Sequence, residues 1–318
     1  MKKDGPKIVV LGLAGSSVFM SVDHFHGPGE TLKAGGLYTE PGGKGCNQAV
    51  AAARLGAQVS FISCMGRDDA ARQCVQFLSD EGITPVTEYT DRENSPYACI
   101  LTDSGGENRV TVYRGAADCL SPAFVRSREA LIGGADMLML NNECPAEAVI
   151  TALGLAEKHG VPALLNPAPA EPMDAELLRR FAVITPNRIE AAQLLGIPED
   201  SGPAELLEGF RRLGIRRAAV TLGGDGAAVL DGDRMYLLPA AEGSAVDTTG
   251  AGDCFNGALA VKLAAGVDLA AAVEYAVNAA SLSVRKRYVM PALPYRAELD
   301  KAYARIDIRP LLNDGSIG

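Results

Sequence analysis

The chain has little of what several protein classes need. Tryptophan is absent, and only three histidines, His24, His26 and His159, occur among 318 residues. So few histidines argue against a histidine-based metal centre or a Ser-His-Asp triad. The seven cysteines are odd in number and form no CxxC pair. We therefore expect free thiols and a reducing, cytoplasmic compartment rather than a disulfide framework.

Positive charge and long apolar runs are also scarce. The chain has 30 Lys and Arg against 39 Asp and Glu, a formal net charge of -9. A nucleic-acid surface needs a basic excess, so we expect no nucleic-acid partner. No window approaches the roughly 20 apolar residues of a membrane helix, and the start of the chain has no secretory h-region, so no membrane partner is expected.

Short β-rich runs alternate with longer helical stretches. The apolar pattern predicts strands over residues 8–11, 59–62, 135–140, 162–165, 182–184 and 218–222. It predicts helices over residues 45–55, 69–81, 145–159, 253–265 and 270–284. Repeated β–α alternation indicates an α/β fold with a mostly parallel central sheet covered by helices on both faces.

Two stretches break this alternation. Residues 15–40 lack helical periodicity and are rich in Gly, Ser and Thr, whereas residues 96–114 have the pattern of a β-hairpin. Together they could build a small antiparallel flap beside the main domain. Ordinary surface excursions would give the same pattern. No repeat or flexible linker is evident, so we expect one domain over residues 1–318.

The most restrictive motif is Asp-Thr-Thr-Gly-Ala-Gly-Asp, which ends at Asp253 and leads directly into a helical pattern. Gly250 and Gly252 flank Ala251. Such small residues let backbone N–H groups converge at a helix N-terminus, where partial positive charge favours a phosphate. Asp253 is then expected at the mouth of an anion site. For the motif taken alone, a role of Asp253 as a simple helix cap is equally acceptable.

A second helix is also entered from glycines. Gly42, Gly43 and Gly45 surround Lys44, and Asn47 follows. The P-loop pattern GxxxxGK[ST] is absent. Close approach of the backbone to a ligand is one interpretation, with Lys44 and Asn47 as hydrogen-bonding groups. A plain strand-to-helix turn is the simpler one, and it is favoured for this segment alone.

Two further segments follow expected strands. Asn187 and Glu190 share a helix face by their i,i+3 spacing, and their oxygen atoms suit a hydrated Mg²⁺ ion. A capping box, with Asn187 as N-cap and Glu190 reaching back, fits the same pattern, and both interpretations can hold together. The glycine turn of Thr221, Gly223 and Gly226 borders a nucleotide or simply turns the chain.

In their order along the chain, these motifs resemble the ribokinase-like (PfkB) family of sugar kinases. The stretches that carry the resemblance are residues 42–56, 166–170, 185–190, 221–226 and 247–253. The resemblance implies a three-layer Rossmann-like α/β domain with a small β-sheet lid, formed here by residues 15–40 and 96–114. Such lids often serve as dimer interfaces, so a homodimer is implied too.

The resemblance also implies an ATP- and Mg²⁺-dependent enzyme that transfers the γ-phosphoryl group to a hydroxyl, expected to be primary, of a sugar or sugar derivative. By match to the motif, Asp253 is the general base, with an anion hole formed by Gly250, Ala251 and Gly252. The matched nucleotide positions are Asn187, Thr221, Gly223, Gly226 and Gly252. Glu190 is implied to reach Mg²⁺ through water.

The sugar side follows from the same match. The implied contacts are Ser17, Gly42, Gly43, Lys44, Asn47, Glu143 and Asp253. Ser17 stands where ribokinases carry an Asp that holds sugar hydroxyls. A serine binds a hydroxyl more weakly than a carboxylate does, so this difference puts D-ribose in doubt as the acceptor.

A monovalent-cation site is only partly matched. In the family, K⁺ often binds between a strand, which corresponds here to Asp247 and Thr249, and a later loop with the pattern Arg-x-Gly-Ala. Here that loop is basic, over residues 285–290, and Tyr288 replaces the glycine. The resemblance leaves K⁺ activation open, and Lys286 or Arg287 is an alternative source of positive charge.

Two other functions remain open. One is a nucleoside kinase on the same fold, which an aromatic residue over the base would favour. The other is a catalytically silent sugar-binding regulator. The intact Asp253 and its Gly-Ala-Gly neighbours argue against a silent protein, because a regulator has no need of a general base.

Overall fold

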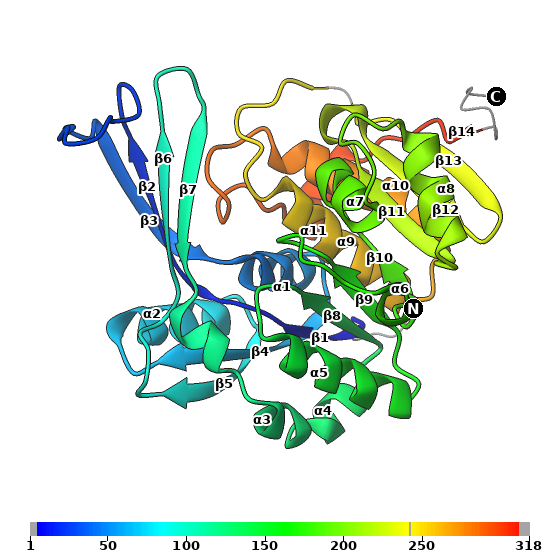
Figure 1. The fold of residues 1–318 in the computed structure, drawn as a ribbon, viewed down its shortest axis with the longest axis horizontal. Coiled ribbons are helices and arrows are strands. Elements are labelled where there is room, and N and C mark those ends of the chain that lie inside the picture. Colours follow the sequence, from blue (N-terminus) through cyan, green and yellow to red (C-terminus); the bar gives the residue numbers. More distant parts are fainter. Residues whose placement is uncertain (1–4, 242, 312–318) are drawn as a thin grey trace.

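The computed structural model describes residues 5–241 and 243–311. Those residues form two sheets that lie apart in Figure 1. The larger has ten strands in the order β14-β13-β12-β11-β10-β9-β8-β1-β4-β5, and the smaller has four in the order β3-β2-β6-β7. No helix in the described residues is long and apolar enough to cross a bilayer. The first four residues of the chain, part of the stretch judged to lack a secretory signal, lie outside this description.

The large sheet is parallel from β5 to β11 and antiparallel from β11 to β14. Its strands are β1 (Lys7–Leu11), β4 (Gln58–Gly66), β5 (Thr84–Thr90), β8 (Met137–Asn141), β9 (Ala163–Asn166), β10 (Val183–Ile184), β11 (Arg217–Thr221), β12 (Ala227–Asp231), β13 (Arg234–Leu238) and β14 (Arg309–Pro310). The mostly parallel sheet expected from the sequence is confirmed.

Helices cover both faces of this sheet and make three layers (Figure 1). One face packs against α1 (Lys44–Arg54), α2 (Asp69–Asp80), α9 (Ala251–Ala264), α10 (Leu269–Ser283) and α11 (Arg296–Ala302). The other packs against α3 (Pro122–Arg126), α4 (Glu129–Gly133), α5 (Ala146–Lys158), α6 (Ala175–Leu178), α7 (Arg188–Leu195) and α8 (Pro203–Arg212). Strand β8 shows why two layers are needed: Met137 and Met139 enter one core and Leu138 and Leu140 the other. Successive side chains of a strand point to opposite faces, so an all-apolar strand must be covered twice.

The small sheet is built from two separate excursions of the chain, β2 (Gly15–Ser21) with β3 (Gly36–Gly42), and β6 (Tyr97–Thr102) with β7 (Asn108–Tyr113). The expected hairpin and the expected separate sheet are both confirmed. The expectation of a purely antiparallel flap is wrong, because the central pair β2–β6 is parallel. Strands β1 and β5 are both part of the parallel run of the large sheet. The chain therefore leaves the large sheet in the same direction after β1 and after β5. Strands β2 and β6, which follow them, are parallel for this reason.

Candidate active site

Helices α1 and α9 begin close together. The contact between them is made at Gly257, where a Cβ atom would lie 2.6 Å from Cβ of Ala51 and 2.8 Å from the carbonyl oxygen of Gln48. Only a glycine allows such an approach of two helices. The first turns of the two helices, which carry the two glycine motifs, are thereby brought to one place.

Asp253 lies at the centre of this convergence. The N-cap of α9 is Gly250, so the interpretation of Asp253 as the helix cap is wrong. Its side chain is instead held by α1: Asn47 Nδ2 donates to one carboxylate oxygen at 2.8 Å, and Gln48 Nε2 donates to the other at 3.0 Å. Burial raises the pKa of Asp253, and this outweighs the lowering by Lys44 and the two amide donors. A fixed carboxylate with a raised pKa suits a general base.

Lys44 lies among three carboxyl groups. Its backbone N–H donates to Glu143 Oε2 at 2.7 Å. Burial would lower the pKa of Lys44, but the nearby charges of Asp253, Glu143 and Glu190 raise it overall. Burial also raises the pKa of Glu143, to about 7. The lysine thus stays charged beside the carboxyl groups of buried Asp253 and of half-buried Glu143 and Glu190.

Further amides extend this network to the ends of the parallel strands. Gln48 Nε2 also donates to Asn166 Oδ1 at 3.0 Å, and Asn166 Nδ2 donates to the carbonyl of Thr185 at 2.9 Å. Asn256 Nδ2 donates to the carbonyl of Gly252 at 2.8 Å. Sequence reasoning missed Gln48. It neighbours Asn47 in the motif, but adjacent helical residues point about 100° apart, so the sequence did not indicate that both reach Asp253.

Some buried polar atoms of the site have no protein partner. They are Asn47 Oδ1, Gln48 Oε1 and Asn141 Nδ2. Buried polar groups in proteins are normally satisfied, and two of these atoms belong to the amides that hold Asp253, so they mark a place that a polar ligand completes. A molecule rich in hydroxyl groups has both the donors and the acceptors required.

Ser17 and the glycines of the first motif fit together. A Cβ atom on Gly42 would lie 2.0 Å from Ser17 Oγ, so the glycine makes room for the serine. Gly43 adopts a φ of 104°, and a Cβ there would lie 2.6 Å from the carbonyl oxygen of Leu13. Strand β3 ends at Gly42 and α1 begins at Lys44. The segment is therefore a strand-to-helix turn, and it presents Lys44 and Asn47 to Asp253.

A cavity of about 550 Å³ lies beside the start of α9. Its lining includes the predicted nucleotide positions Asn187, Thr221, Gly223, Gly226 and Gly252. The residues that sequence reasoning missed are mostly small or apolar: Gly224, Ala240, Ala241, Gly243, Ala245, Thr248, Phe255, Val277, Ala280, Ser281 and Val284. A cavity of this size with an apolar wall and glycine turns fits a nucleotide, whose phosphates would lie toward the amides of α9.

Asn187 and Glu190 form the capping box that the sequence allowed, with both hydrogen bonds at 2.8 Å. Burial raises the pKa of Glu190. Within residues 5–241 and 243–311, no group of three His, Cys, Asp or Glu side chains could hold a metal ion. The described residues therefore contain no metal site built from protein side chains alone. The oxygen atoms of Glu190 fit a hydrated Mg²⁺ that arrives with the phosphates.

Asp247 and Thr249 form a closed local structure. One carboxylate oxygen of Asp247 accepts hydrogen bonds from Thr249 N at 2.9 Å and Thr249 Oγ1 at 2.6 Å, and the other accepts from Tyr288 N at 2.9 Å. Tyr288 has a φ of 66°, a conformation natural for glycine, which agrees with its alignment to a family glycine. Lys286 pairs with Glu298 at 3.2 Å.

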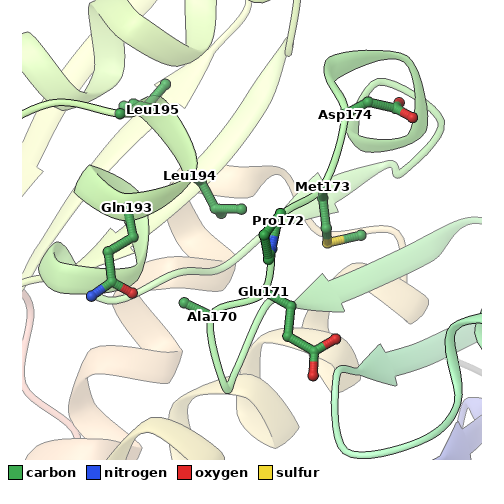
Figure 2. Close-up of a pocket in the computed structure, with 9 residues that line it drawn as sticks. Ala170, Glu171, Pro172, Met173, Asp174, Gln193, Leu194 and Leu195 are labelled. Carbon is green, nitrogen blue, oxygen red and sulfur yellow. The ribbon is translucent and has the colours of Figure 1, made fainter.

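A second cavity, of about 710 Å³, lies between residues 170–174 and the end of α7 (Figure 2). Figure 2 shows Gln193 and Leu194 of the helix on one side and Pro172 and Met173 on the other. None of the predicted site residues lines it. It shares no lining residue with the nucleotide-sized cavity.

These features together define a class. A buried carboxylate at a glycine-opened helix, beside a nucleotide-sized cavity and unpaired polar atoms, is the arrangement of a phosphotransferase with an alcohol acceptor, because such transfer needs positioning and electrostatic donors more than covalent chemistry. The family model for pfkB family carbohydrate kinases matches residues 6–296. The chain belongs to this family and is a carbohydrate kinase.

Individual relatives agree with the family. The chain is 36% identical over 294 residues to a ribokinase of Haemophilus influenzae, which covers 92% of this chain and 96% of that protein. It is 38% identical over 299 residues to a bifunctional ribokinase/ribose-5-phosphate isomerase A of Fructilactobacillus sanfranciscensis, where the match covers 91% of this chain and 55% of that longer protein. A structure of Arabidopsis thaliana ribokinase complexed with ribose and ATP superposes with a TM-score of 0.86 at 27% identity, covering 94% of this chain and 99% of the other.

Proposed function

We propose that the protein transfers the γ-phosphoryl group of ATP to a primary hydroxyl of a pentose, with D-ribose or a close derivative as acceptor. The observation that carries this proposal is the buried Asp253, fixed by Asn47 and Gln48 at the start of α9. The names of the relatives support a ribose-like acceptor. The replacement at Ser17 argues for a change in how the sugar hydroxyls are held, so close derivatives belong to the same proposal.

Each part of the site has a role in this reaction. Asp253 takes the proton of the attacking hydroxyl, a step that contributes roughly 10²–10⁴-fold. The backbone amides of Gly250, Ala251 and Gly252 bind the charge on the phosphoryl group as it transfers. The nucleotide occupies the cavity beside Thr221 and the turn that follows it. Ser17, Lys44, Asn47 and Glu143 hold the sugar.

A bound Mg²⁺ supplies neutralisation of the phosphate charge and orients the phosphate oxygens. Glu190 is the residue proposed to hold it, through water, from its position in the capping box with Asn187. Asp247 and Thr249 remain candidates for a monovalent cation. Asp247 also accepts hydrogen bonds from Thr249 and from Tyr288 N, and these bonds order residues 247–249 without a cation.

We further propose that residues 1–318 act as one kinase domain whose small sheet is a lid over the sugar. A lid excludes water, which otherwise competes as phosphoryl acceptor. Strand β7, at one edge of this sheet, carries exposed apolar side chains, with Val110 58% and Val112 49% exposed. Such a face suits a homodimer contact. All seven cysteines are free thiols, which fits a cytoplasmic setting.

The test is ADP release from Mg·ATP across pentoses, 2-deoxyribose, hexoses, amino sugars, sugar acids and nucleosides, with Na⁺ or K⁺ as the counter-ion. We expect turnover with D-ribose or a close derivative. Strong turnover with a nucleoside alone would identify a nucleoside kinase instead. Tight sugar binding without turnover on any compound would identify a silent regulator, and a large rate gain with K⁺ would identify a working cation site.

A further inference from the structure

The loop between α10 and α11 contacts Gly250, the first residue of the proposed anion hole. A Cβ atom added to Gly250 would lie 2.6 Å from Val289 Cγ1, so Val289 packs directly against the glycine backbone. Gly250 has a left-handed φ of 76° and is the N-cap of α9. The position of Val289 therefore limits where Gly250, and with it the first amides of α9, can lie.

Glu40, on strand β3 of the small sheet, holds this loop. Its side chain is buried, with 5% of the residue exposed. One carboxylate oxygen accepts a hydrogen bond from Val289 N at 2.9 Å, and the other accepts from Met290 N at 3.0 Å. Hydrogen bonds to an ionised acceptor are roughly twice as strong as those between neutral groups. A buried carboxylate with two consecutive backbone donors is therefore a firm attachment between residues about 250 positions apart.

A second contact from the same strand supports the loop. Tyr38 lies two residues before Glu40 and so faces the same side of β3. Its ring stacks on that of Tyr288, with centroids 3.9 Å apart and an interplanar angle of 21°, and Phe19 meets Tyr288 edge-on at 5.3 Å. Within the described residues, Tyr288 is the one non-glycine residue with a positive φ. That conformation is strained for a residue that carries a side chain, so surrounding contacts must hold it.

The opposite side of the loop is held by helix α1, which packs on the large sheet. Arg54, the last residue of α1, donates to the carbonyls of Met290 and Leu293 and pairs with Glu81 at 2.6 Å. The loop is therefore held from both sides, by residues of the small sheet and by Arg54 of α1. Glu40 makes the hydrogen-bonded attachment on the side of the small sheet, and three residues beyond it β3 has passed into the turn before Lys44.

We propose that Glu40 is a positioning residue for phosphoryl transfer. It fixes Val289 and Met290, and through Val289 it fixes Gly250 and the anion hole. Because β3 runs on into the sugar-side turn, the same residue ties the sugar side of the site to the phosphoryl side. The inference rests on the proposed function of Asp253 and of the amides at the start of α9.

The first test is Glu40→Gln, which keeps the size of the side chain but removes its charge and one of its two acceptor oxygens. We expect kcat to fall about tenfold, while the sugar KM and the dissociation constant of ATP stay within about twofold. A second readout needs no turnover. The affinity for ADP with aluminium fluoride and sugar, which imitates the transferring phosphoryl group, should fall by the same factor as kcat, whereas ADP alone should bind as before.

The matched control is Glu274→Gln. Glu274 is equally buried, at 3% exposed, and also accepts a backbone hydrogen bond, from Ile306 N at 2.8 Å. It does not line the nucleotide-sized cavity. The control should lose stability but keep its kcat and its aluminium fluoride affinity. If Glu40→Gln does not fold, Val289→Ala tests the same link at the Gly250 contact, and the same pattern of constants is expected.

Three results would overturn the proposal. One is an unchanged kcat and unchanged aluminium fluoride affinity in the folded Glu40→Gln or Val289→Ala protein. Another is an equal loss in the Glu274 control, which would show a general effect of a lost buried hydrogen bond. The third is a raised sugar KM at normal kcat, which would make Glu40 a substrate contact. An inactive wild type whose aluminium fluoride affinity still depends on Glu40 would contradict the proposed acceptor and leave this inference standing.

Discussion

The two sheets of the molecule differ in how they are covered. In the large sheet every residue of β8 and β9 is buried, whereas every residue of β7 in the small sheet is exposed. Helices pack on both faces of the first, and the outermost strand of the second is open. The large sheet and its helices thus carry Asp253, and the small sheet reaches the candidate site through residues of β2 and β3 and through the turn that follows β3.

The two sheets also carry different parts of the candidate site. The proposed general base, the proposed anion hole and the nucleotide-sized cavity belong to helices and turns at the edge of the large sheet. The small sheet contributes Ser17, the approach to Lys44 and the Glu40 attachment. Changes in the two regions should therefore affect different quantities.

The largest effect is expected in the base region, from Asp253→Asn. The amide keeps the shape of the side chain but accepts no proton, so kcat should fall roughly 10²–10⁴-fold with the sugar dissociation constant little changed. Steady-state kinetics and calorimetric binding of the sugar measure the two quantities. Turnover within threefold of wild type would show that another group is the base.

A core change in the large sheet should reduce stability instead. Phe61 of β4 is fully buried, so Phe61→Ala should lower the free energy of unfolding by about 3–5 kcal/mol. Urea unfolding measures the loss. A cost below 1 kcal/mol would contradict the assignment of β4 to the packed core.

The half-buried carboxyl group of Glu143, beside Lys44, should make stability depend on pH. Burial raises the pKa of Glu143 from 4.5 to about 7 in the folded state. A raised pKa means that its stabilising contribution is complete below pH 4.5 and is lost as the pH rises through 7. Glu143→Gln should therefore gain stability relative to wild type over this window, by up to roughly 3 kcal/mol. Unfolding curves of both proteins from pH 4.5 to 8 give the difference in the free energy of unfolding. If the wild type became the more stable of the two as the pH rises, the raised pKa of Glu143 would be refuted.

The smallest effect on folding is expected on the open strand. Val110 is 58% exposed, so Val110→Glu should change the free energy of unfolding of the monomer by no more than about 0.5 kcal/mol. If the small sheet is the homodimer contact, the same change should dissociate the dimer, because it places a charge in an apolar interface. Sedimentation at several concentrations measures association. An intact dimer would exclude this face.

Much of the fold was predictable because the buried strands are short apolar runs and the helices have an apolar face. Strands were missed for two different reasons. Strand β5 has the sequence TPVTEYT and lies at the edge of the sheet, where polar side chains and a proline are tolerated. The antiparallel hairpin β12–β13 was also missed, because it breaks the β–α alternation that guided the prediction.

The candidate site divides in the same way. The residues in glycine motifs were found, since a glycine run before a helix has a local physical meaning. Gln48 and Glu40 were not, because nothing local distinguishes them from ordinary residues. Their partners lie 205 positions away for Gln48 and Asp253, and 249 for Glu40 and Val289. Tyr288 was singled out as the replacement of a glycine, but its stacking on Tyr38 was not predicted.

The sequence by itself determined the α/β class, the carbohydrate kinase family and the identity of the residues at two helix starts. These depend on periodicity and on short motifs, whose physical meaning is local. Only the tertiary structure decided that α1 and α9 meet at Gly257, that Asp253 is held by two amides of α1, and that Glu40 reaches the loop beside Gly250. Such contacts arise when distant segments pack, and packing depends on the shape of the whole core rather than on neighbours in the chain.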